Sequence, residues 1–587
     1  MILRELAAYA ERLEDRGDLP PRMYQGQPLK WLIELDHDGA FQGFVSTVAE
    51  GAKGREKRGK EFLAPFIKRT SSVRAQLLAD RAGYALGLAD REHQSPQELG
   101  RIAEAHAAFV GLVDRCAAQL DEPTVEAVRV FLSGLNLASL PVPEGVQSGD
   151  GVTFLVEGVL PIDLPLVRRW WAETFEHSAD PRSLRTCLVC GKPRMPAKRH
   201  PVPIKGIPGG QSSGMQIVSA NENAFESYGL QASLIAPVCH PCAEHYAQAA
   251  NALLGDAQTH LRVGPAQFLF WTKGDNGFSP ATLLSQPSPE EVRELLASVY
   301  SGRHAQPFAD ETFFVAALSA SGGRVAVRGW SATTVGQARR ALARFFRLQD
   351  LVDPKGQPGR PLGVFALAAS LVREAKDLQA HTLEAMVRCA LNGDRLQNSI
   401  LAQALGRTRA GGSAQNPVVS RQRAAIIKLV LASQIPEQEG DRMRQLDLEN
   451  QSAAYLCGRL LATLERIQYL AVHPKATLVD RFYGSASSAP MAVYPSLLRT
   501  SQSHLGKLRK ASPGVHRALQ VKLEEILSGM SEFPRVLTLN EQGLFALGYY
   551  HQRAEDHRRA SAGKVGKDKS ERDENLEPTD DQAEVQA

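Results

Sequence analysis

The sequence predicts an α+β protein: a mixed N-terminal and middle region with a small, mainly antiparallel sheet and a zinc clip, followed by an all-α C-terminal bundle. Three observations lead to this prediction. Runs rich in Val and Phe, typical of strands, begin near residue 150. From about Leu362 onward, apolar residues recur at steps of three and four, which is typical of helices. Four of the seven cysteines form two Cys-x-x-Cys pairs, the spacing of zinc ligands.

The length of the chain, 587 residues, exceeds the size at which one hydrophobic core keeps growing. We expect a mostly helical N-terminal domain with a basic loop (1–150) and an α+β domain with the cysteine pairs and a Gly-rich loop (151–350). A helical bundle (351–552) and a disordered tail (553–587) should follow. The tail is nearly free of large apolar side chains and rich in charges of both signs.

The N-terminal domain is interrupted by a basic, Gly-punctuated stretch that leads into a run of basic and hydroxyl side chains at 68–74. Such side chains can hold phosphates and can reach base edges if the loop enters a groove. Alternatively, Ser71 or Ser72 caps a helix that runs through Tyr84. Both interpretations can hold together, because the free N–H groups at a helix start also bind anions.

Four runs in the middle of the chain predict strands, at 152–160, 267–271, 312–318 and 324–328. The last two are separated by a Ser- and Gly-rich segment that is suited to a hairpin loop. This arrangement favours a small sheet packed beneath the loop region.

Helices are predicted after the last strand and through most of the remaining chain. Ser331-Ala-Thr-Thr is a helix start signal. The clearest apolar stripe runs from Ala453 to Ile467, and such a stripe is far more often a bundle core than a cofactor site. Asn540 is expected to cap a terminal helix.

The two cysteine pairs are Cys187 with Cys190, and Cys239 with Cys242. Four thiolates satisfy tetrahedral zinc and leave no open position for catalysis, so we expect structural zinc. The intervening 48 residues exceed the usual gap of a compact zinc ribbon. Unligated thiols and a catalytic role are therefore the alternatives. The other three cysteines lie singly in helical patterns and are expected in the core.

Basic residues are unevenly distributed, although the net charge is only +4. Lys and Arg occur without Asp or Glu in three windows: seven in 181–221, six in 395–436 and seven in 481–523. A solvated face normally mixes the signs, so these windows favour a nucleic-acid surface. The sequence lacks an apolar run long enough to span a membrane and a signal peptide, and we expect a cytoplasmic protein.

The sequence lacks the motifs of several enzyme classes. The chain has no phosphate-binding Gly-x-x-x-x-Gly-Lys-Ser/Thr loop, no dinucleotide fingerprint after a strand and no His-Glu-x-x-His. Gly-Gln-Ser-Ser-Gly at 210–214 matches the hydrolase nucleophile elbow, but Gly and Pro rather than an apolar strand precede it. We interpret it as a loop and expect no enzymatic activity.

Several blocks resemble one protein family over nearly the whole chain. They are Ile204-Lys-Gly with Gly209-Gly-Gln-Ser-Ser-Gly214, Asn223-Ala-Phe-Glu-Ser-Tyr-Gly229, the segment 68–87, Val327-Arg-Gly-Trp330, Tyr455-Leu-Cys-Gly-Arg-Leu460 and Gly548-Tyr-Tyr-His-Gln552. Together they resemble the large subunit of the type I-C CRISPR effector complex (Cascade). Many members of that family have other residues where the second cysteine pair stands, so the zinc prediction rests on spacing alone.

The resemblance implies a non-catalytic subunit of a crRNA-guided surveillance complex in antiviral defence. Such a subunit binds DNA and RNA, reads the protospacer-adjacent motif (PAM) in double-stranded DNA, stabilises the R-loop and recruits a helicase–nuclease. Implied partners are the crRNA-bearing backbone subunits, the crRNA-processing subunit and a small subunit made from the C-terminal region of the same chain. Met443 is a candidate start for that product, so the bundle is expected to be small-subunit-like from about 443.

We therefore assign candidate DNA-binding residues to the basic windows and loops. Gln211, Asn221 and Asn223 are expected to read base edges, and Lys68, Arg69 and Lys205 to hold phosphates. The remaining candidates are Thr70, Ser71, Ser72, Arg74, Ser212, Ser213, Arg407, Arg409, Arg421, Arg423, Lys507, Arg509 and Lys510. Those in the helical windows are expected to hold strand backbones without sequence preference.

Two other functions are compatible with the residues. One is a stand-alone zinc-containing regulator that binds DNA or RNA, which would bind its target without crRNA. The other is a metal-dependent nuclease or deaminase, which is disfavoured because acidic ligands do not cluster in the basic windows.

Overall fold

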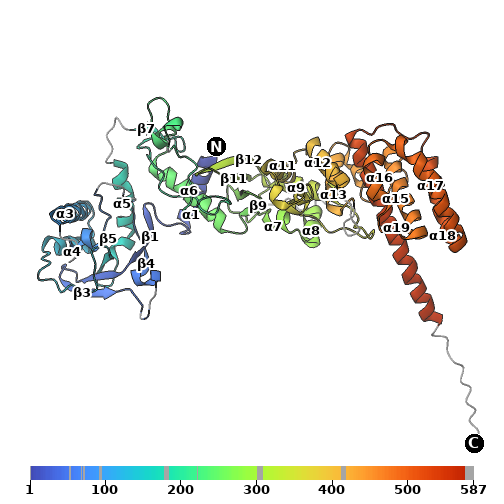
Figure 1. Ribbon diagram of the computed structural model, residues 1–587. Helices are drawn as coiled ribbons and strands as arrows, with labels where there is room; N and C mark the ends of the chain where they lie inside the picture. Colours follow the sequence, from blue (N-terminus) through green and yellow to red (C-terminus); the bar gives the residue numbers. More distant parts are fainter. Residues whose placement is uncertain are drawn as a thin grey trace, which may run out of the picture. The chain divides into compact units, whose positions relative to one another are not determined.

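Figure 1 shows the computed structural model of the protein, which describes residues 2–49, 51, 54–67, 69, 73–90, 95–177, 184–220, 222–300, 308–410 and 418–574. The chain forms two compact units. The first consists of Met1–Gly206, Gln211–Ala252 and Gly322–Val325, and the second of Ile207–Gly210, Leu253–Ser321 and Ala326–Ala587. Among the described helices, none has both the length and the apolar character needed to cross a membrane.

The first unit is built around a four-stranded sheet with the order β3-β2-β6-β5. Strands β2 and β6 run parallel and the other neighbours antiparallel, while β1 and β4 form a separate antiparallel pair. The strands are β1 Tyr24–Leu29, β2 Trp31–Leu35, β3 Phe41–Ser46, β4 Lys60–Pro65, β5 Ala79–Arg81 and β6 Gly151–Val156. The helices are α1 Ile2–Asp15, α2 Ala82–Ala85, α3 Pro96–Gln119, α4 Pro123–Ser133, α5 Pro165–His177 and α6 His240–Gly255, of which the last ends in the second unit.

The N-terminal 150 residues contain more strand than predicted. Strand β6 confirms the strand expected at 152–160, but β1 to β5 were not predicted. These strands are short and interrupted by polar residues, Gly or Pro, as in the Tyr-Gln-Gly-Gln-Pro-Leu sequence of β1. A strand of this kind lacks the alternating apolar pattern that marks a half-buried strand in sequence.

The compact units also cut across the predicted boundaries at 150 and 350. Helix α6 packs with N-terminal elements, because His245 lies 3.3 Å from the carboxylate of Glu14 on α1. The carboxylate of Glu244 accepts a hydrogen bond of 3.4 Å from the backbone N–H of Met23. These contacts join the cysteine-bearing segment to the first unit.

The second unit contains a four-stranded sheet with the order β12-β11-β10-β9. Its strands are β9 His260–Val263, β10 Ala266–Thr272, β11 Thr312–Ser321 and β12 Arg324–Thr334. The strands predicted at 267–271, 312–318 and 324–328 are therefore confirmed. Helix α9 follows β12 and is capped by Thr334, whose hydroxyl accepts a hydrogen bond from the N–H of Gln337, as its start signal predicted.

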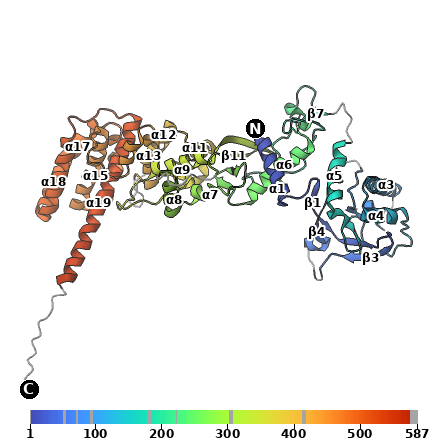
Figure 2. The same ribbon diagram turned by 180° about the vertical axis from the view of Figure 1, so that it is seen from behind.

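The rest of the second unit is helical (Figure 2). Buried residues of these helices form one hydrophobic core with those of the sheet. The helices are α7 Ala281–Ser285, α8 Pro289–Tyr300, α9 Val335–Gln349, α10 Val364–Ala369, α11 Ala380–Asn392, α12 Asn398–Ala410, α13 Arg421–Ala432, α14 Glu437–Arg442, α15 Ala453–Val472, α16 Leu478–Ala486, α17 Pro490–Ala511, α18 Pro513–Ser528 and α19 Leu539–Glu574. The predicted α+β class, with small sheets and a helical C-terminal region, is confirmed.

Two details at the C-terminal end differ from prediction. Helix α19 is capped by Thr538, which exchanges hydrogen bonds with Glu541, and not by Asn540. The segment predicted as a disordered tail is helical as far as Glu574. Its first part is held to the bundle by a buried contact of Asp556 with Lys522, which charge composition alone did not reveal.

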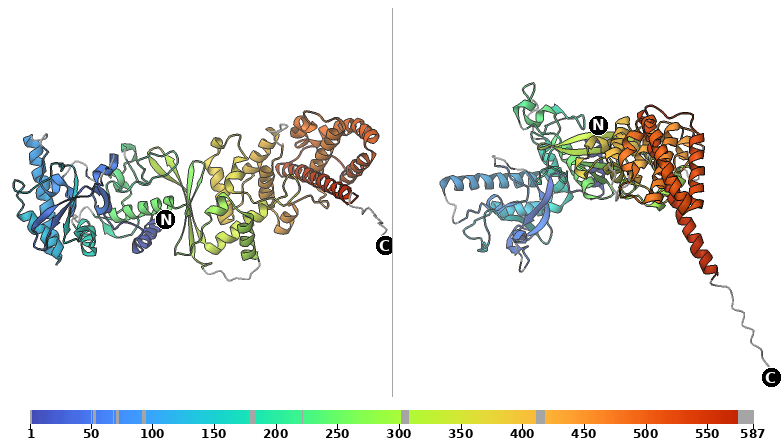
Figure 3. Two further views of the ribbon diagram at one scale, coloured as in Figure 1. Left: turned by 90° about the horizontal axis from the view of Figure 1, so that it is seen from below. Right: turned by 45° about the vertical axis from the view of Figure 1, so that its right-hand side comes forward.

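Among the described helices of the bundle, α15 and α19 make the most extensive contact. The bundle is coloured orange to red in Figure 3. Gly458 of α15 and Gly548 of α19 let the two backbones approach. A Cβ atom at Gly458 would collide with the carbonyl oxygen of Phe545 and lie 2.8 Å from the backbone nitrogen of Tyr549. A Cβ at Gly548 would collide with the carbonyl oxygen of Tyr455. Backbone atoms cannot move aside as a flexible side chain can, so both positions require glycine.

We predict that Gly458→Ala destabilises the second unit by roughly 1–3 kcal/mol, because the methyl group forces α15 and α19 apart. The matched control is Gly406→Ala in α12, where a Cβ meets nothing within 4 Å. The control should be neutral or stabilising by about 1 kcal/mol through helix propensity. Urea unfolding of the full chain, followed by circular dichroism, measures both. Equal unfolding midpoints for the two variants would contradict the packing argument.

Candidate metal centre and nucleic-acid interface

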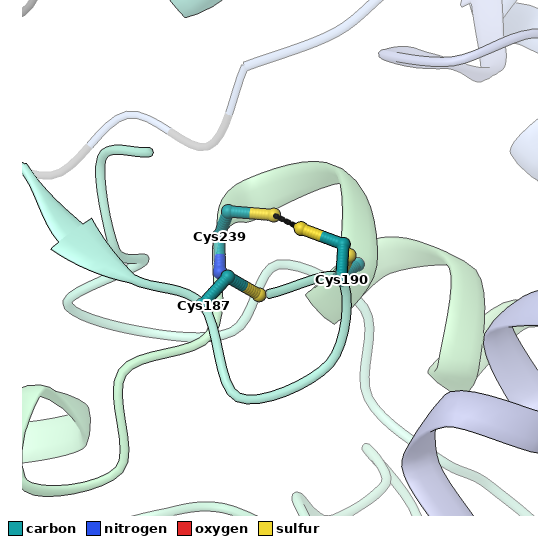
Figure 4. Close-up of side chains that lie close together, drawn as sticks. Cys187, Cys190 and Cys239 are labelled. Atoms are coloured by element: carbon teal, nitrogen blue, oxygen red, sulfur yellow. Dashed lines mark hydrogen bonds between the residues drawn. The ribbon is translucent and has the colours of Figure 1, made fainter. Parts of the chain in front are cut away.

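The four paired cysteines meet in the first unit. Figure 4 shows three of them, Cys187, Cys190 and Cys239, close together. Cys187 and Cys190 lie in the turn between two short strands, β7 Arg185–Thr186 and β8 Pro193–Arg194. Gly191 follows with a φ of 72°, in the left-handed region that glycine adopts without strain. Cys239 directly precedes α6 and Cys242 lies in its first turn. The turn that carries the first cysteine pair and the helix start that carries the second thus lie together, although the two pairs are far apart in sequence.

The sulfur positions fit a tetrahedral metal. The four Sγ atoms all lie within 4.8 Å of one another, and Sγ of Cys190 is 3.9 Å from Sγ of Cys239. Zinc–sulfur bonds of about 2.3 Å place tetrahedral sulfurs about 3.8 Å apart. Backbone N–H groups of Val189 and Cys239 point at Sγ of Cys187, at 3.4 and 3.3 Å, as they do around a thiolate ligand. These residues can hold a metal ion.

The thiols influence one another's protonation. A hydrogen bond from Cys242 lowers the pKa of Cys239 to about 5. The same hydrogen bond raises the pKa of Cys242, and burial raises the pKa of Cys190. Within this pair, Cys239 therefore loses its proton more readily than Cys242. A bound divalent cation would offset the repulsion that opposes further thiolates.

Helix α6 also holds the Gly-rich loop at 205–214. The side-chain oxygen of Asn251 on α6 accepts a hydrogen bond of 2.9 Å from the backbone N–H of Lys205. The side-chain nitrogen of Asn251 donates one of 3.0 Å to the carbonyl of Pro203. Ile204 and Met215 exchange two backbone hydrogen bonds of 2.8 Å and are buried. The base of the loop is thus closed on both sides.

The tip of the loop presents polar side chains to solvent. Lys205, Gln211, Ser212 and Ser213 are exposed, as their proposed contacts with nucleic acid require. Gly214 has a φ of 90°, and a Cβ there would lie 2.8 Å from that of Pro203. Ser212 follows no strand, so the interpretation of the 210–214 motif as a loop and not a nucleophile elbow is confirmed.

The segment 223–229 is fixed beside this loop by the start of β12. The guanidinium of Arg324 stacks on the ring of Phe225 at 4.0 Å and donates a hydrogen bond of 3.4 Å to the carbonyl of Ser219. Glu226 accepts a hydrogen bond of 3.1 Å from the N–H of Ala232. Asn223 is exposed, as predicted, whereas Asn221 lies outside the described residues.

Tyr228 is an exposed residue that sequence reasoning did not select. Its side chain is 98 % exposed, and its φ of 54° is followed by a φ of 69° at Gly229. A hydrogen bond of 2.9 Å from the N–H of Leu230 to the carbonyl of Ser227 closes this turn. The neighbouring Phe225 and Glu226 both have partners in the protein, but Tyr228 has none among the described residues. The sequence signal that could have identified Tyr228 is the Tyr-Gly pair, typical of a turn, within the block 223–229 that resembles the family.

The N-terminal basic loop is organised differently from the prediction. Lys68, Thr70, Ser71 and Ser72 lie outside the described residues, and Arg74 is exposed.

Arg69 is not free to hold a phosphate, because its guanidinium pairs with the buried carboxylate of Asp80. It also stacks on Tyr84 at 3.9 Å and donates a hydrogen bond of 2.7 Å to the carbonyl of Arg74. Arg69 therefore stabilises this segment through contacts inside the protein.

Three arginines of the 395–436 window are likewise hydrogen-bonded within the protein. Arg421 donates to the carbonyl of Arg360, and Arg423 donates to those of Ser370 and Val418. Burial lowers the pKa of both guanidinium groups. Arg407 is half-buried, and Arg409 is exposed but donates to the side chain of Gln542. This window is mainly a packing surface.

The 481–523 window does present free cations. Lys507, Arg509 and Lys510 are exposed in the last turn and a half of α17. No carboxylate pairs with them among the described residues. Of the three basic windows, this one keeps the most charge on a helical surface that faces solvent.

The family of the chain follows from its match to a family of known proteins. The family described as CRISPR-associated protein (Cas_Csd1) matches residues 6–556. A search of curated proteins returns no match. The matched region includes the cysteine cluster, the Gly-rich loop, the segment 223–229 and most of the helical bundle. The chain belongs to the Cas_Csd1 family of CRISPR-associated proteins, which agrees with its resemblance to the large subunit of the type I-C CRISPR effector complex.

Proposed function

We propose that the chain is the non-catalytic large subunit of a crRNA-guided type I-C surveillance complex in antiviral defence, acting in the cytoplasm. In this role it reads the PAM of double-stranded DNA, stabilises the R-loop and recruits a helicase–nuclease. The observation that carries the proposal is the exposed, glycine-rich loop at 205–214, clamped by α6, in a CRISPR-associated chain. A clamped loop with exposed amide and hydroxyl groups suits groove recognition.

Within this interface the side chains have different roles. Gln211 and Asn223 carry amides that can pair with base edges in a groove, and Lys205 is suited to a phosphate. The two amides belong to one neighbourhood, because the side-chain nitrogen of Gln211 lies beside Gly323, the residue before Arg324. The free ring of Tyr228 offers a stacking surface for a base, which is independent of base identity.

The helical bundle supports contact with strand backbones and with other subunits. Lys507, Arg509 and Lys510 of α17 hold the displaced strand or the heteroduplex by charge alone. We propose crRNA-bearing backbone subunits and a crRNA-processing subunit as further partners. A small subunit would begin near Met443, which directly follows α14, so that it contains α15 to α19 complete.

We propose structural zinc as the occupant of the cysteine cluster. Four thiol ligands are the set that structural zinc sites use, and they leave no open coordination position. The metal would join the 187–190 turn to the start of α6, the helix that clamps the loop through Asn251. The metal would thus stabilise the interface without contacting nucleic acid.

The first test of the proposal is co-purification of the chain with crRNA-bearing partners, followed by binding to a library of PAM sequences. Gln211→Ala and Asn223→Ala should relax discrimination among PAMs by roughly 1–3 kcal/mol for each base that is no longer read. Lys205→Ala and Tyr228→Ala are the comparison variants, and they should weaken all PAMs alike. An unchanged PAM profile for Gln211→Ala and Asn223→Ala would reject these residues as readers.

Zinc is tested by elemental analysis of the purified chain. We expect about one zinc per chain, and near zero in Cys187→Ser/Cys239→Ser, since two of four ligands are removed. Cys116→Ala, which replaces a buried cysteine elsewhere in the first unit, should keep full zinc content. A chain without zinc, or a double variant that retains it, would show that the cluster is not a zinc site.

Charge reversal of Lys507, Arg509 and Lys510 to Glu should weaken target binding by the complex equally for all PAMs. The slope of binding against salt concentration should fall by roughly 0.9 for each phosphate that is no longer neutralised. The control is Arg101→Glu/Arg115→Glu on α3, two exposed arginines outside the basic windows. A change in PAM preference, or an unaltered salt dependence, would remove α17 from the backbone-binding surface.

A further inference from the structure

A cavity of about 330 Å³ lies within the second unit between β12 and α11. Its floor is apolar and consists of Phe268, Val315, Val387 and Leu391. Small-molecule sites span about 300–1,000 Å³, so this cavity admits one small planar group and excludes a helix or strand of a partner. The Arg-Gly-Trp block at 328–330 lines it, and the function proposed above does not use that block.

The walls of the cavity carry hydrogen-bonding groups that the protein leaves free. The half-buried carboxylate of Glu384 has no partner among the described residues, and the side-chain nitrogen of Asn392 is likewise unpaired there. Arg328 uses its Nε to bond Ser319 at 2.8 Å, and the rest of its exposed guanidinium faces no carboxylate of the described residues. Arg388, in contrast, is neutralised by Asp394 at 2.6 Å.

A glycine keeps the cavity open. A Cβ at Gly329 would lie 2.7 Å from Oε1 of Glu384, so that even alanine would displace the carboxylate. Trp330 is held in place by stacking on Phe314, with ring centroids 5.5 Å apart and planes at 13°. The unpaired carboxylate of Glu384 therefore lies against the backbone of β12 at Gly329, next to the fixed ring of Trp330.

We propose that this cavity binds one unpaired nucleotide of a single strand and prefers cytosine or adenine, in which an exocyclic amine lies beside an unprotonated ring nitrogen, over thymine, which has a carbonyl oxygen and an N–H at these positions. The carboxylate of Glu384 accepts the amine hydrogen, and the amide of Asn392 donates to the neighbouring ring nitrogen. Arg328 at the mouth holds the phosphate, and the apolar floor contacts the face of the base. The inference rests on the proposed function only for the source of the nucleotide, the displaced strand.

Two labelled single-stranded dodecamers, one of deoxycytidine and one of thymidine, test this with the purified full chain. Both bases are pyrimidines, and they differ at the amine, at the ring nitrogen and by the 5-methyl group of thymine, which makes no hydrogen bond. By fluorescence anisotropy, the wild-type chain should bind the deoxycytidine strand roughly tenfold more tightly. Glu384→Ala should reduce the difference to about twofold or less, with thymidine binding unchanged. Arg328→Ala should weaken binding to both strands alike.

Two further variants separate the cavity from general effects of charge and folding. Gly329→Ala keeps every polar group but displaces the carboxylate of Glu384, so it should weaken the preference as Glu384→Ala does. Glu374→Ala removes an exposed glutamate outside the cavity and should keep the preference.

Failure of the wild-type chain to bind either strand, equal binding of both, or a preference that survives in Glu384→Ala and Gly329→Ala would overturn the proposal. PAM selection by the assembled complex is measured separately. If the complex selects PAMs but the isolated chain binds both strands equally, this inference is wrong and the proposed function stands. If the isolated chain shows the base preference but the complex does not select PAMs, the proposed function is wrong and this inference stands.

Discussion

The hold of α6 on the Gly-rich loop is the constraint on which the proposed interface depends. Glycines make the tip of this loop intrinsically free, and freedom costs binding energy when a loop must be ordered on a ligand. Asn251 and the Ile204–Met215 pair fix both ends, so only the tip remains to be ordered. The cysteine cluster lies at the opposite end of α6 from Asn251. A metal bound there would fix the start of α6, and the helix would in turn fix the loop that Asn251 holds.

Charge in the sequence does not translate directly into a binding surface. Arg421 and Arg423 of the 395–436 window donate to backbone carbonyl groups, and Arg69 pairs with Asp80, because a buried guanidinium requires hydrogen-bond partners inside the protein. Lys205 and the end of α17 keep their charge in water. The electrostatic surface is therefore smaller than the count of basic residues indicates, and in the proposed function it is divided between a loop for recognition and a helix for backbone contact.

The bundle illustrates a second constraint, the direct contact of two helix backbones. Gly458 and Gly548 allow α15 and α19 to approach until main-chain atoms touch, which no larger residue permits. Three polar residues of α19, His551, Gln552 and Asp556, are buried inside the bundle. Nδ1 of His551 lies 3.0 Å from the hydroxyl of Tyr455 on α15. Such pairing gives the bundle a specific arrangement as well as a hydrophobic core.

Local patterns in the sequence determined three of the four strands of the second unit, the helical bundle and the four cysteines at metal-ligand spacing, because periodicity and short motifs report on neighbours along the chain. The blocks along the chain also identified its family. Tertiary structure alone decided what depends on distant contacts. It brought Cys190 and Cys239 together across 48 residues, buried Asp80 beneath Arg69, left Tyr228 without a partner in the described part of the chain and opened the cavity beside Glu384. The exposure and the partners of a side chain depend on segments that are remote in sequence. Residue type and spacing could therefore indicate candidate residues, but they could not show which of them are exposed and which are paired inside the protein.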